Sequence, residues 1–320
     1  MPFAGSGQQL QGGDNLINRL KSASRKVLLS ALIFLIFVYI TVLLCSIPGD
    51  FTITLEDGSL TPSHIGIFII KDANEKFISL LKLDLGGTGR DSKSLNYLVT
   101  KTMKNSVTLL FGGLVLAVIF GIPKGIVDSK RDSTSGSSLK VLGTIIPISL
   151  PDIMIIALLQ RLAVFLNKQG IEIFRVGGSG TINHMLLPVI ALSVLPACYI
   201  ARITSMSIDS CYKQDFINAA IGKGCSRNRI LWNHVMRNAM PSIIDSLPAI
   251  TSIIIGNLLM VESVFSYPGL TYALVNFFAE YERDGIIASI ILIGIIYFLL
   301  EAVFNLLKWI VVKPLREGSL

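Results

Sequence analysis

Long apolar runs alternate with shorter polar segments along this chain, and this alternation predicts its architecture. A run of about 20 apolar residues is long enough to cross the hydrocarbon core of a bilayer as a helix. Six such runs predict six transmembrane helices, at residues 27–47, 106–123, 141–166, 185–201, 246–261 and 285–307. The fourth and fifth runs contain Pro188, Pro196 and Pro248, which a helical bundle tolerates because neighbouring groups satisfy the freed backbone atoms. We therefore expect an all-α membrane protein.

The polar segments between the runs predict how the chain is divided and oriented. We expect a lead-in at 1–26, a first span, a loop at 48–105, a core of five spans at 106–312 and a tail at 313–320. Lys and Arg gather in the lead-in, in the second and fourth connections and in the tail, which places those segments and both termini in the cytoplasm. The loop at 48–105 would then lie outside, and apolar residues at partly alternating spacing from Phe51 to Ile69 predict a short strand pair within it.

Composition agrees with a membrane protein and narrows its chemistry. Hydrophobic residues make up 52% of the chain, charged residues 15%, and the mean hydropathy is +0.66. The net charge of +7 comes from residues between the apolar runs without interleaved aromatic residues, so we expect contact with membrane lipid and not with nucleic acid. The four cysteines lack metal-ligand spacing, and no nucleophile triad, phosphate loop or zinc motif is found. We expect no catalytic residue, cofactor or metal in this chain.

The polar segment 213–241 is the main candidate for function, because it is too polar for hydrocarbon and too long for a simple turn. Asp215 can cap a helix that reaches Gly222, and Gly224 can end that helix in a left-handed conformation. A second helix would run from Ser226 to Met240 and stop at Pro241, so that the pair forms an elbow outside the membrane. A solvated basic loop that touches only lipid head groups is the alternative. The candidate residues are Asp215, Asn218, Ala219, Ala220, Gly222, Gly224, Arg227, His234 and Pro241.

Short motifs along the chain resemble one family in its own order. Asn218-Ala219-Ala220 and Gly224 resemble the EAA loop of permease subunits of binding-protein-dependent ABC importers, although Asn218 stands where that motif has an acidic residue. The chain is most similar to the B-type permease of the oligopeptide, dipeptide and nickel group. The other matching segments are Pro48-Gly49-Asp50, Leu83-Asp84-Leu85-Gly86, Ser149-Leu150-Pro151, Ala201-Arg202-Ile203-Thr204, Val261 to Leu270, Arg283-Asp284 and Lys313-Pro314-Leu315-Arg316.

This resemblance implies a type I ABC importer permease fold in a bacterial inner membrane, with the elbow seated on an ATP-hydrolysing subunit. It implies four kinds of partner or ligand: a second permease, two ATP-binding cassette subunits, an extracytoplasmic solute-binding protein, and ATP with magnesium bound by the cassette subunits. The implied solute is a peptide, and nickel, a metal chelate or glutathione is the alternative within the same architecture. An ion-coupled secondary transporter is the alternative from a different class, and it would show inverted repeats. A membrane-embedded enzyme would need a polar catalytic set that the sequence lacks.

Several residues outside the elbow are candidates for the translocation path or its gate. Asp152 either lines the path or caps a helix break at Pro151, and Arg161 either lines the path or extends to the outer interface. Arg283 and Asp284 are expected to form a local ion pair before the last span. By the resemblance, the segment that contains Glu262, Pro268 and Gly269 lines the outer mouth of the path.

Overall fold

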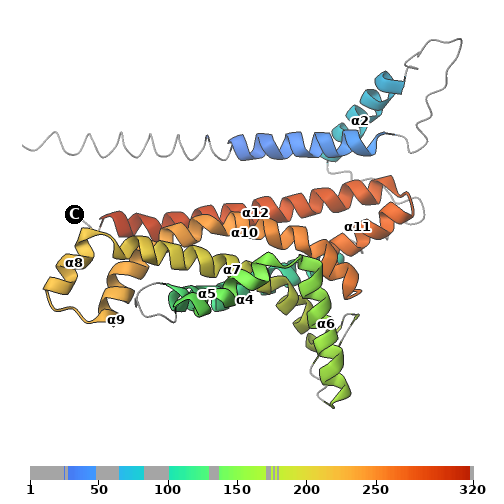
Figure 1. The fold of residues 1–320 in the computed structure, drawn as a ribbon. Coiled ribbons are helices and arrows are strands. Elements are labelled where there is room, and N and C mark those ends of the chain that lie inside the picture. Colours follow the sequence, from blue (N-terminus) through green and yellow to red (C-terminus); the bar gives the residue numbers. More distant parts are fainter. Residues whose placement is uncertain are drawn as a thin grey trace, which may run out of the picture.

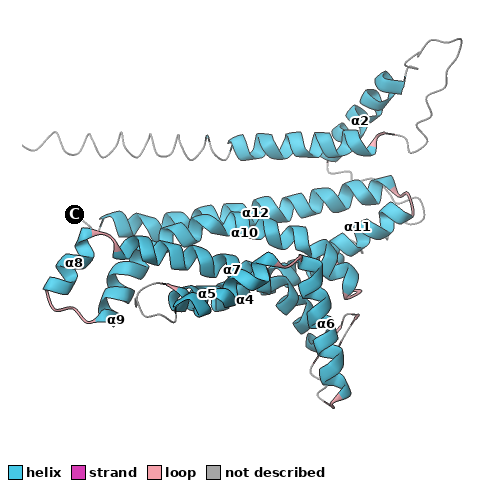
Figure 2. Cartoon of the chain, viewed as in Figure 1, coloured by secondary structure: helices cyan, strands magenta, loops and turns pink. Residues whose placement is uncertain are grey.

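The computed structural model of the protein describes residues 25, 28–47, 65–82, 101–129, 137–170, 174–175, 177–178 and 180–317. In these ranges the chain consists of helices and loops, without a strand (Figure 2). The first helix is Leu28–Cys45. The helices that follow are α2 (Ile65–Leu81), α4 (Met103–Asp128), α5 (Ser137–Ser149), α6 (Asp152–Lys168), α7 (Ile182–Tyr212), α8 (Asp215–Gly222), α9 (Arg227–Arg229), the π-helix η2 (Ile230–Val235), α10 (Met236–Val264), α11 (Leu270–Ala279) and α12 (Arg283–Glu317). The predicted all-α class is confirmed.

Five of the described helices are long and apolar enough to cross a membrane. They are Leu28–Cys45, α4, α7, the continuous stretch Arg227–Val264 and the Arg283–Lys308 part of α12. α5 and α6 together make a sixth crossing if the bent pair counts as one span. In Figure 1, α7, α10 and α12 run side by side, α8 and α9 lie at one end of this bundle, and α6 projects away from it.

The predicted third span over 141–166 contains a helix break at Pro151, which the sequence allows. α5 and α6 meet at 108°, with the bend at Leu150 and Pro151 (Figure 1). Pro151 has a ψ of 138°, outside the helical region, and a proline also disfavours the helical conformation of the residue before it. The motif Ser149-Leu150-Pro151 therefore turns the chain out of the bundle.

The fourth and fifth spans are longer than predicted, because their prolines do not end them. The predicted spans 185–201 and 246–261 lie inside α7, with 31 residues, and α10, with 29 residues. Pro188 and Pro196 are buried against neighbouring helices. The predicted helix stop at Pro241 is also wrong, since Pro241 lies inside α10. Packing within the bundle compensates for the backbone hydrogen bond that each proline removes.

The pairing of α4 with α7 forms the centre of the main core. Two glycines of α4, Gly121 and Gly125, let the two backbones come close. A Cβ atom at Gly125 would lie 2.5 Å from the Ala201 carbonyl oxygen and 2.6 Å from Thr204 Cβ. Small residues four positions apart are a common device for close helix contact in membranes. This crossing fixes α4 against the helix that leads into α8.

The first helix and α2 attach to α12. Val38 and Val42 of the first helix and Ala73 of α2 are buried together with Ile287 and Ile291 of α12. Most of the first helix is exposed and apolar, with only 17% of its residues buried. Its outer face is therefore suited to lipid.

Part of the predicted strand pair in the loop 48–105 is contradicted by α2. Ile65, Ile67, Phe68 and Ile69 are helical, because the apolar positions from 65 to 80 continue at helical spacing into α2. The other half of the pair, from Phe51 to Leu55, lies outside the described residues, as does the predicted lead-in except for residue 25.

Candidate functional site

The candidate site is an elbow that connects α7 to α10 and consists of α8, α9 and η2 (Figure 1). α8 has the bounds that the sequence predicts, Asp215–Gly222. The predicted capping role of Asp215 is wrong, because Gln214 occupies the N-cap and Asp215 is the first helical residue. A carboxylate in the first turn still stabilises the helix through its dipole.

Gly224 ends α8 in the left-handed conformation that the sequence predicts. Its φ is +76°, and its backbone N–H donates to the Ile221 carbonyl oxygen at 2.9 Å. The Cys225 N–H donates to the Ala220 carbonyl oxygen at 3.2 Å. These bonds close the helix end and turn the chain toward the second arm of the elbow.

The inner face of the elbow packs on a small apolar core. Ile217 and Ala220 of α8 and Leu231 and Val235 of η2 are buried against Ile208 and Cys211 of α7 and Met236 and Ala239 of α10. Of the two alanines predicted to admit a partner, Ala220 is therefore covered by the chain itself. The elbow is fixed to two spans through this core.

The outer face of α8 is uncovered. Asn218, Ala219 and Gly222 are exposed, and Ile221 is 58% exposed. Among the described residues, no atom outside the helix's own backbone lies within 4 Å of a Cβ built at Gly222. The sequence predicted Asn218, Ala219 and Gly222 as candidates but missed Ile221. The available signal was an apolar residue that directly follows the inward-facing Ala220.

The second arm of the elbow differs from its prediction. Instead of one α-helix from Ser226 to Met240, three α-helical residues are followed by the π-helix η2, which leads into α10 without a stop. Ser226 is the N-cap, as predicted, but its side chain makes no capping hydrogen bond. Arg227 lies on exposed α9, and His234 lies half-buried in η2. Trp232 is 60% exposed on η2 and was missed by the sequence prediction.

Pro151 and Asp152 lie at the bend between α5 and α6. Pro151 is exposed at the N-cap of α6, and Asp152 is half-buried in its first turn. Arg161 is exposed on α6. The role of these three residues in the path stays a prediction.

Glu262, a candidate for the mouth of the path, instead faces the protein interior. It has no exposed surface and ties together α4, α10 and α11. Its carboxylate accepts hydrogen bonds from the Ser106 hydroxyl at 2.5 Å, the Thr271 N–H at 2.9 Å, the Thr271 hydroxyl at 2.5 Å and the Tyr272 N–H at 3.0 Å. These partners include the free backbone donors at the start of α11.

Pro268 and Gly269 form the turn that brings α11 onto Glu262. A Cβ at Gly269 would lie 2.0 Å from the carboxylate oxygen Oε1, so only glycine fits there. The Pro268 carbonyl oxygen accepts a hydrogen bond from the Asn105 amide at 2.7 Å. Burial raises the pKa of the Tyr267 hydroxyl in the same turn, and the nearby Glu262 charge raises it further, so Tyr267 stays neutral.

The local ion pair predicted between Arg283 and Asp284 is wrong, because each residue pairs with α2 instead. The Arg283 guanidinium contacts the Asp72 carboxylate and the Ser46 hydroxyl. The Asp284 carboxylate lies 2.7 Å from Lys76 Nζ. The two crossed pairs join α2 and the end of the first helix to the start of α12.

Comparison with known proteins gives one consistent family. The sequence profile of the family described as "Binding-protein-dependent transport system inner membrane component" matches residues 113–317. The chain is 27% identical to the peptide transport system permease protein SapB of Haemophilus influenzae over 267 residues, 75% of this chain and 83% of that protein. It is 30% identical to the dipeptide transport system permease protein DppB of Bacillus subtilis over 240 residues, 72% of this chain and 75% of that protein.

A solved structure supports the fold independently of sequence. A chain of the MetNI methionine ABC transporter, in an inward-facing conformation, superposes with a TM-score of 0.59 at 15% identity. The match covers 69% of this chain and 99% of the other. The two chains therefore share a fold, and this chain is longer than the shared part.

Proposed function

Because the chain belongs to the family of binding-protein-dependent transport system inner membrane components, we propose that it is the permease subunit of an ATP-driven importer of peptides. The names of both relatives support a peptide as the solute. The observation that carries the proposal is the elbow. It is fixed to α7 and α10 on its inner face, and its outer face is uncovered.

We propose that the outer face of the elbow seats on an ATP-binding cassette subunit. Ala219 and Gly222 are small enough to admit the backbone of a partner, and the exposed Ile221 and Trp232 provide apolar contact area on the elbow. The buried face would transmit the movement, because Ile217 belongs to an apolar core that also contains residues of α7 and α10. Closure of the cassette subunits would then shift two spans at once, and ATP with its magnesium would be bound and hydrolysed outside this chain.

The proposed assembly contains a second permease, two cassette subunits and an extracytoplasmic binding protein. Support for the second permease comes from α6, which leaves the bundle and exposes Met154, Leu158, Leu162 and Phe165 along its length (Figure 1). These residues recur every three or four positions and so form an apolar stripe that a neighbouring helix can cover. The distribution of Lys and Arg supports a bacterial inner membrane orientation with both termini and the elbow in the cytoplasm.

The importer reconstituted in proteoliposomes is expected to accumulate a labelled tripeptide only when ATP and the binding protein are both present. The reason is that, in the proposed assembly, the cassette subunits supply the energy of ATP hydrolysis and the binding protein delivers the peptide. Uptake should persist when an ionophore removes ion gradients. Gradient-driven uptake by this chain without cassette subunits would contradict the proposal and indicate a secondary transporter.

Ile221→Asp is expected to weaken the association of the permease with its cassette subunits by about tenfold or more, because a carboxylate would enter an apolar contact. Co-purification in mild detergent measures this association. Tyr281→Asp is the control, since Tyr281 is 88% exposed at the opposite end of the bundle, between α11 and α12. Equal recovery of cassette subunits with Ile221→Asp and with wild type would show that the elbow is not the coupling surface.

A further inference from the structure

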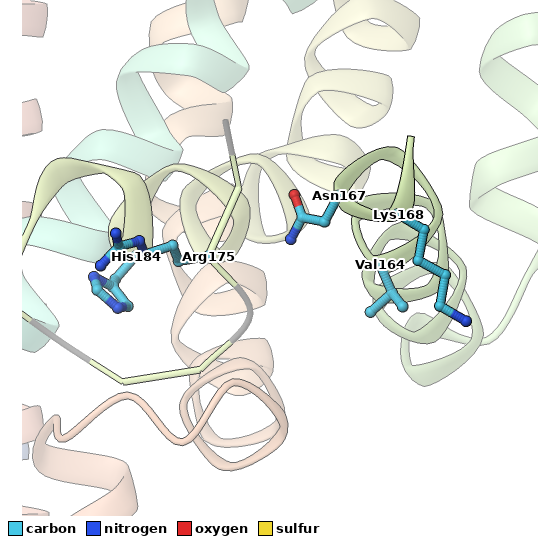
Figure 3. Close-up of a pocket in the computed structure, with 5 residues that line it drawn as sticks. All are labelled: Val164, Asn167, Lys168, Arg175 and His184. Atoms are coloured by element: carbon cyan, nitrogen blue, oxygen red, sulfur yellow. The ribbon is translucent and has the colours of Figure 1, made fainter. Parts of the chain in front are cut away.

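An open pocket of about 530 Å³ lies where α6 ends and α7 begins. Val164, Asn167 and Lys168 of α6 line one side of it, and Arg175 and His184 line the other (Figure 3). α7 carries the elbow at its other end, so the length of this 31-residue helix separates the pocket from the coupling surface. The pocket is therefore distinct from the candidate site described above.

The lining of the pocket favours a negatively charged group. Three of its five described residues are basic and none is acidic. In Figure 3, Arg175 and His184 lie on the same side, and the Asn167 amide points toward that side from α6. The Lys168 ammonium points away from Arg175 and His184, so its charge would attract an anion without contacting it. The first turn of α7, which holds His184, also carries the partial positive charge of a helix N-terminus.

The walls of the pocket are held in place by short contacts. The Asn167 Nδ2 group donates to the Phe174 carbonyl oxygen at 2.7 Å, and the Arg175 N–H donates to the Asn183 carbonyl oxygen at 3.3 Å. Thr181 Oγ1 lies 2.7 Å from His184 Nδ1 and orients the imidazole ring. Arg175 and His184 are thus anchored to the same helix start, and Asn167 is tied to the segment that precedes Arg175.

The Asn167 side chain belongs to the wall of the pocket. Its Oδ1 atom is buried and makes no hydrogen bond with any of the described residues, so it is not accessible to a ligand from the opening. The pocket consequently presents the Arg175 guanidinium and the His184 imidazole as its polar groups for a ligand.

We propose that this pocket binds the C-terminal end of a transported peptide. Arg175 and His184 would hold the terminal carboxylate. Val164 would contact the last side chain. The C-terminal end of a peptide carries a carboxylate next to a side chain, which fits a lining with basic residues and one apolar residue. The inference rests on the proposed function as a peptide permease and adds a feature of the solute that this chain would recognise.

The test uses the complete reconstituted importer with two probes, trialanine and trialanine amide, at saturating binding protein. Arg175→Gln is expected to lower ATP-dependent uptake of trialanine by about tenfold, the effect of losing one charged hydrogen bond, and to leave uptake of the amide unchanged. Lys71→Gln is the control, since Lys71 is an exposed cation on α2. It should leave uptake of both probes unchanged.

Three results would overturn the inference. Wild-type trialanine uptake by Arg175→Gln would show that the pocket does not hold the carboxylate. An equal fall for both probes, with a matching fall in ATPase stimulation by the binding protein, would assign the pocket to docking of that protein. Failure of the wild-type importer to carry either probe would refute the proposed function itself, and this inference with it.

Discussion

Glu262→Ala is expected to lower the free energy of unfolding of the purified protein by about 3–5 kcal/mol, since it leaves buried donors of Ser106, Thr271 and Tyr272 without an acceptor. The reason lies in the position of the carboxylate, which has no exposed surface and joins three helices. A thermal unfolding curve in detergent measures the loss, and we expect the midpoint to fall by roughly 5–10 °C.

Two further variants make the Glu262 result specific. Glu262→Gln keeps the volume and one acceptor oxygen, so its loss should be smaller than that of Glu262→Ala. Glu280→Ala removes an exposed carboxylate at the other end of α11 and should change stability by less than about 0.5 kcal/mol. If Glu262→Ala melted like wild type, the hydrogen bonds at this corner would not be what holds α11 in place.

Gly125→Leu is expected to prevent the close packing of α4 on α7 and to abolish the recovery of folded protein from membranes. A single added Cβ would already lie 2.5 Å from the Ala201 carbonyl oxygen, where a backbone atom cannot move aside without shifting α7. Gly125→Ala should cost about 1–3 kcal/mol, the usual range for an overfilled core. Size-exclusion chromatography and thermal unfolding of each variant measure these effects.

Gly256→Ala is the matched control for Gly125, since it also adds a methyl group to a glycine inside a membrane-spanning helix. In the part of the chain that the structure describes, no atom outside the helix's own backbone lies within 4 Å of a Cβ at Gly256. This change should therefore be neutral or stabilise the helix by up to about 1 kcal/mol. Similar losses for Gly125→Ala and Gly256→Ala would show that the α4–α7 crossing does not depend on a glycine.

The helices that cross the membrane could be predicted from the sequence, whereas the effect of each proline could not. Hydropathy locates a span because a polar side chain costs free energy at any position in the hydrocarbon core of the bilayer. Pro151 has a ψ angle outside the helical region and turns the chain, but Pro188 and Pro241 lie inside continuous helices. The difference depends on the neighbours that pack around each proline, and a single sequence does not contain that information.

Some features of the candidate site depend on residues close in the sequence and could be predicted, whereas others depend on contacts between distant residues and could not. The bounds of α8 and the left-handed Gly224 follow from residues close in the chain, and both were predicted. The partner of Arg283, Asp72, is 211 positions away, and no local pattern indicates it. The outward position of Ile221 was missed for a related reason, because it depends on which face of α8 packs on α7 and α10.

The π-helix η2 makes the second arm of the elbow tolerant of a change in chain length at this point. Each residue of an α-helix turns the chain by about 100°, whereas a π-helical turn takes up an additional residue within one turn. Deleting one residue from Ile230–Val235 would therefore convert this turn to α-helix and leave α9 in nearly the same direction relative to α10. Deleting one residue from the regular part of α10 would instead rotate the residues before it by about 100° relative to those after it. The elbow can thus lose a residue in η2, but not in α10, without turning its outer face.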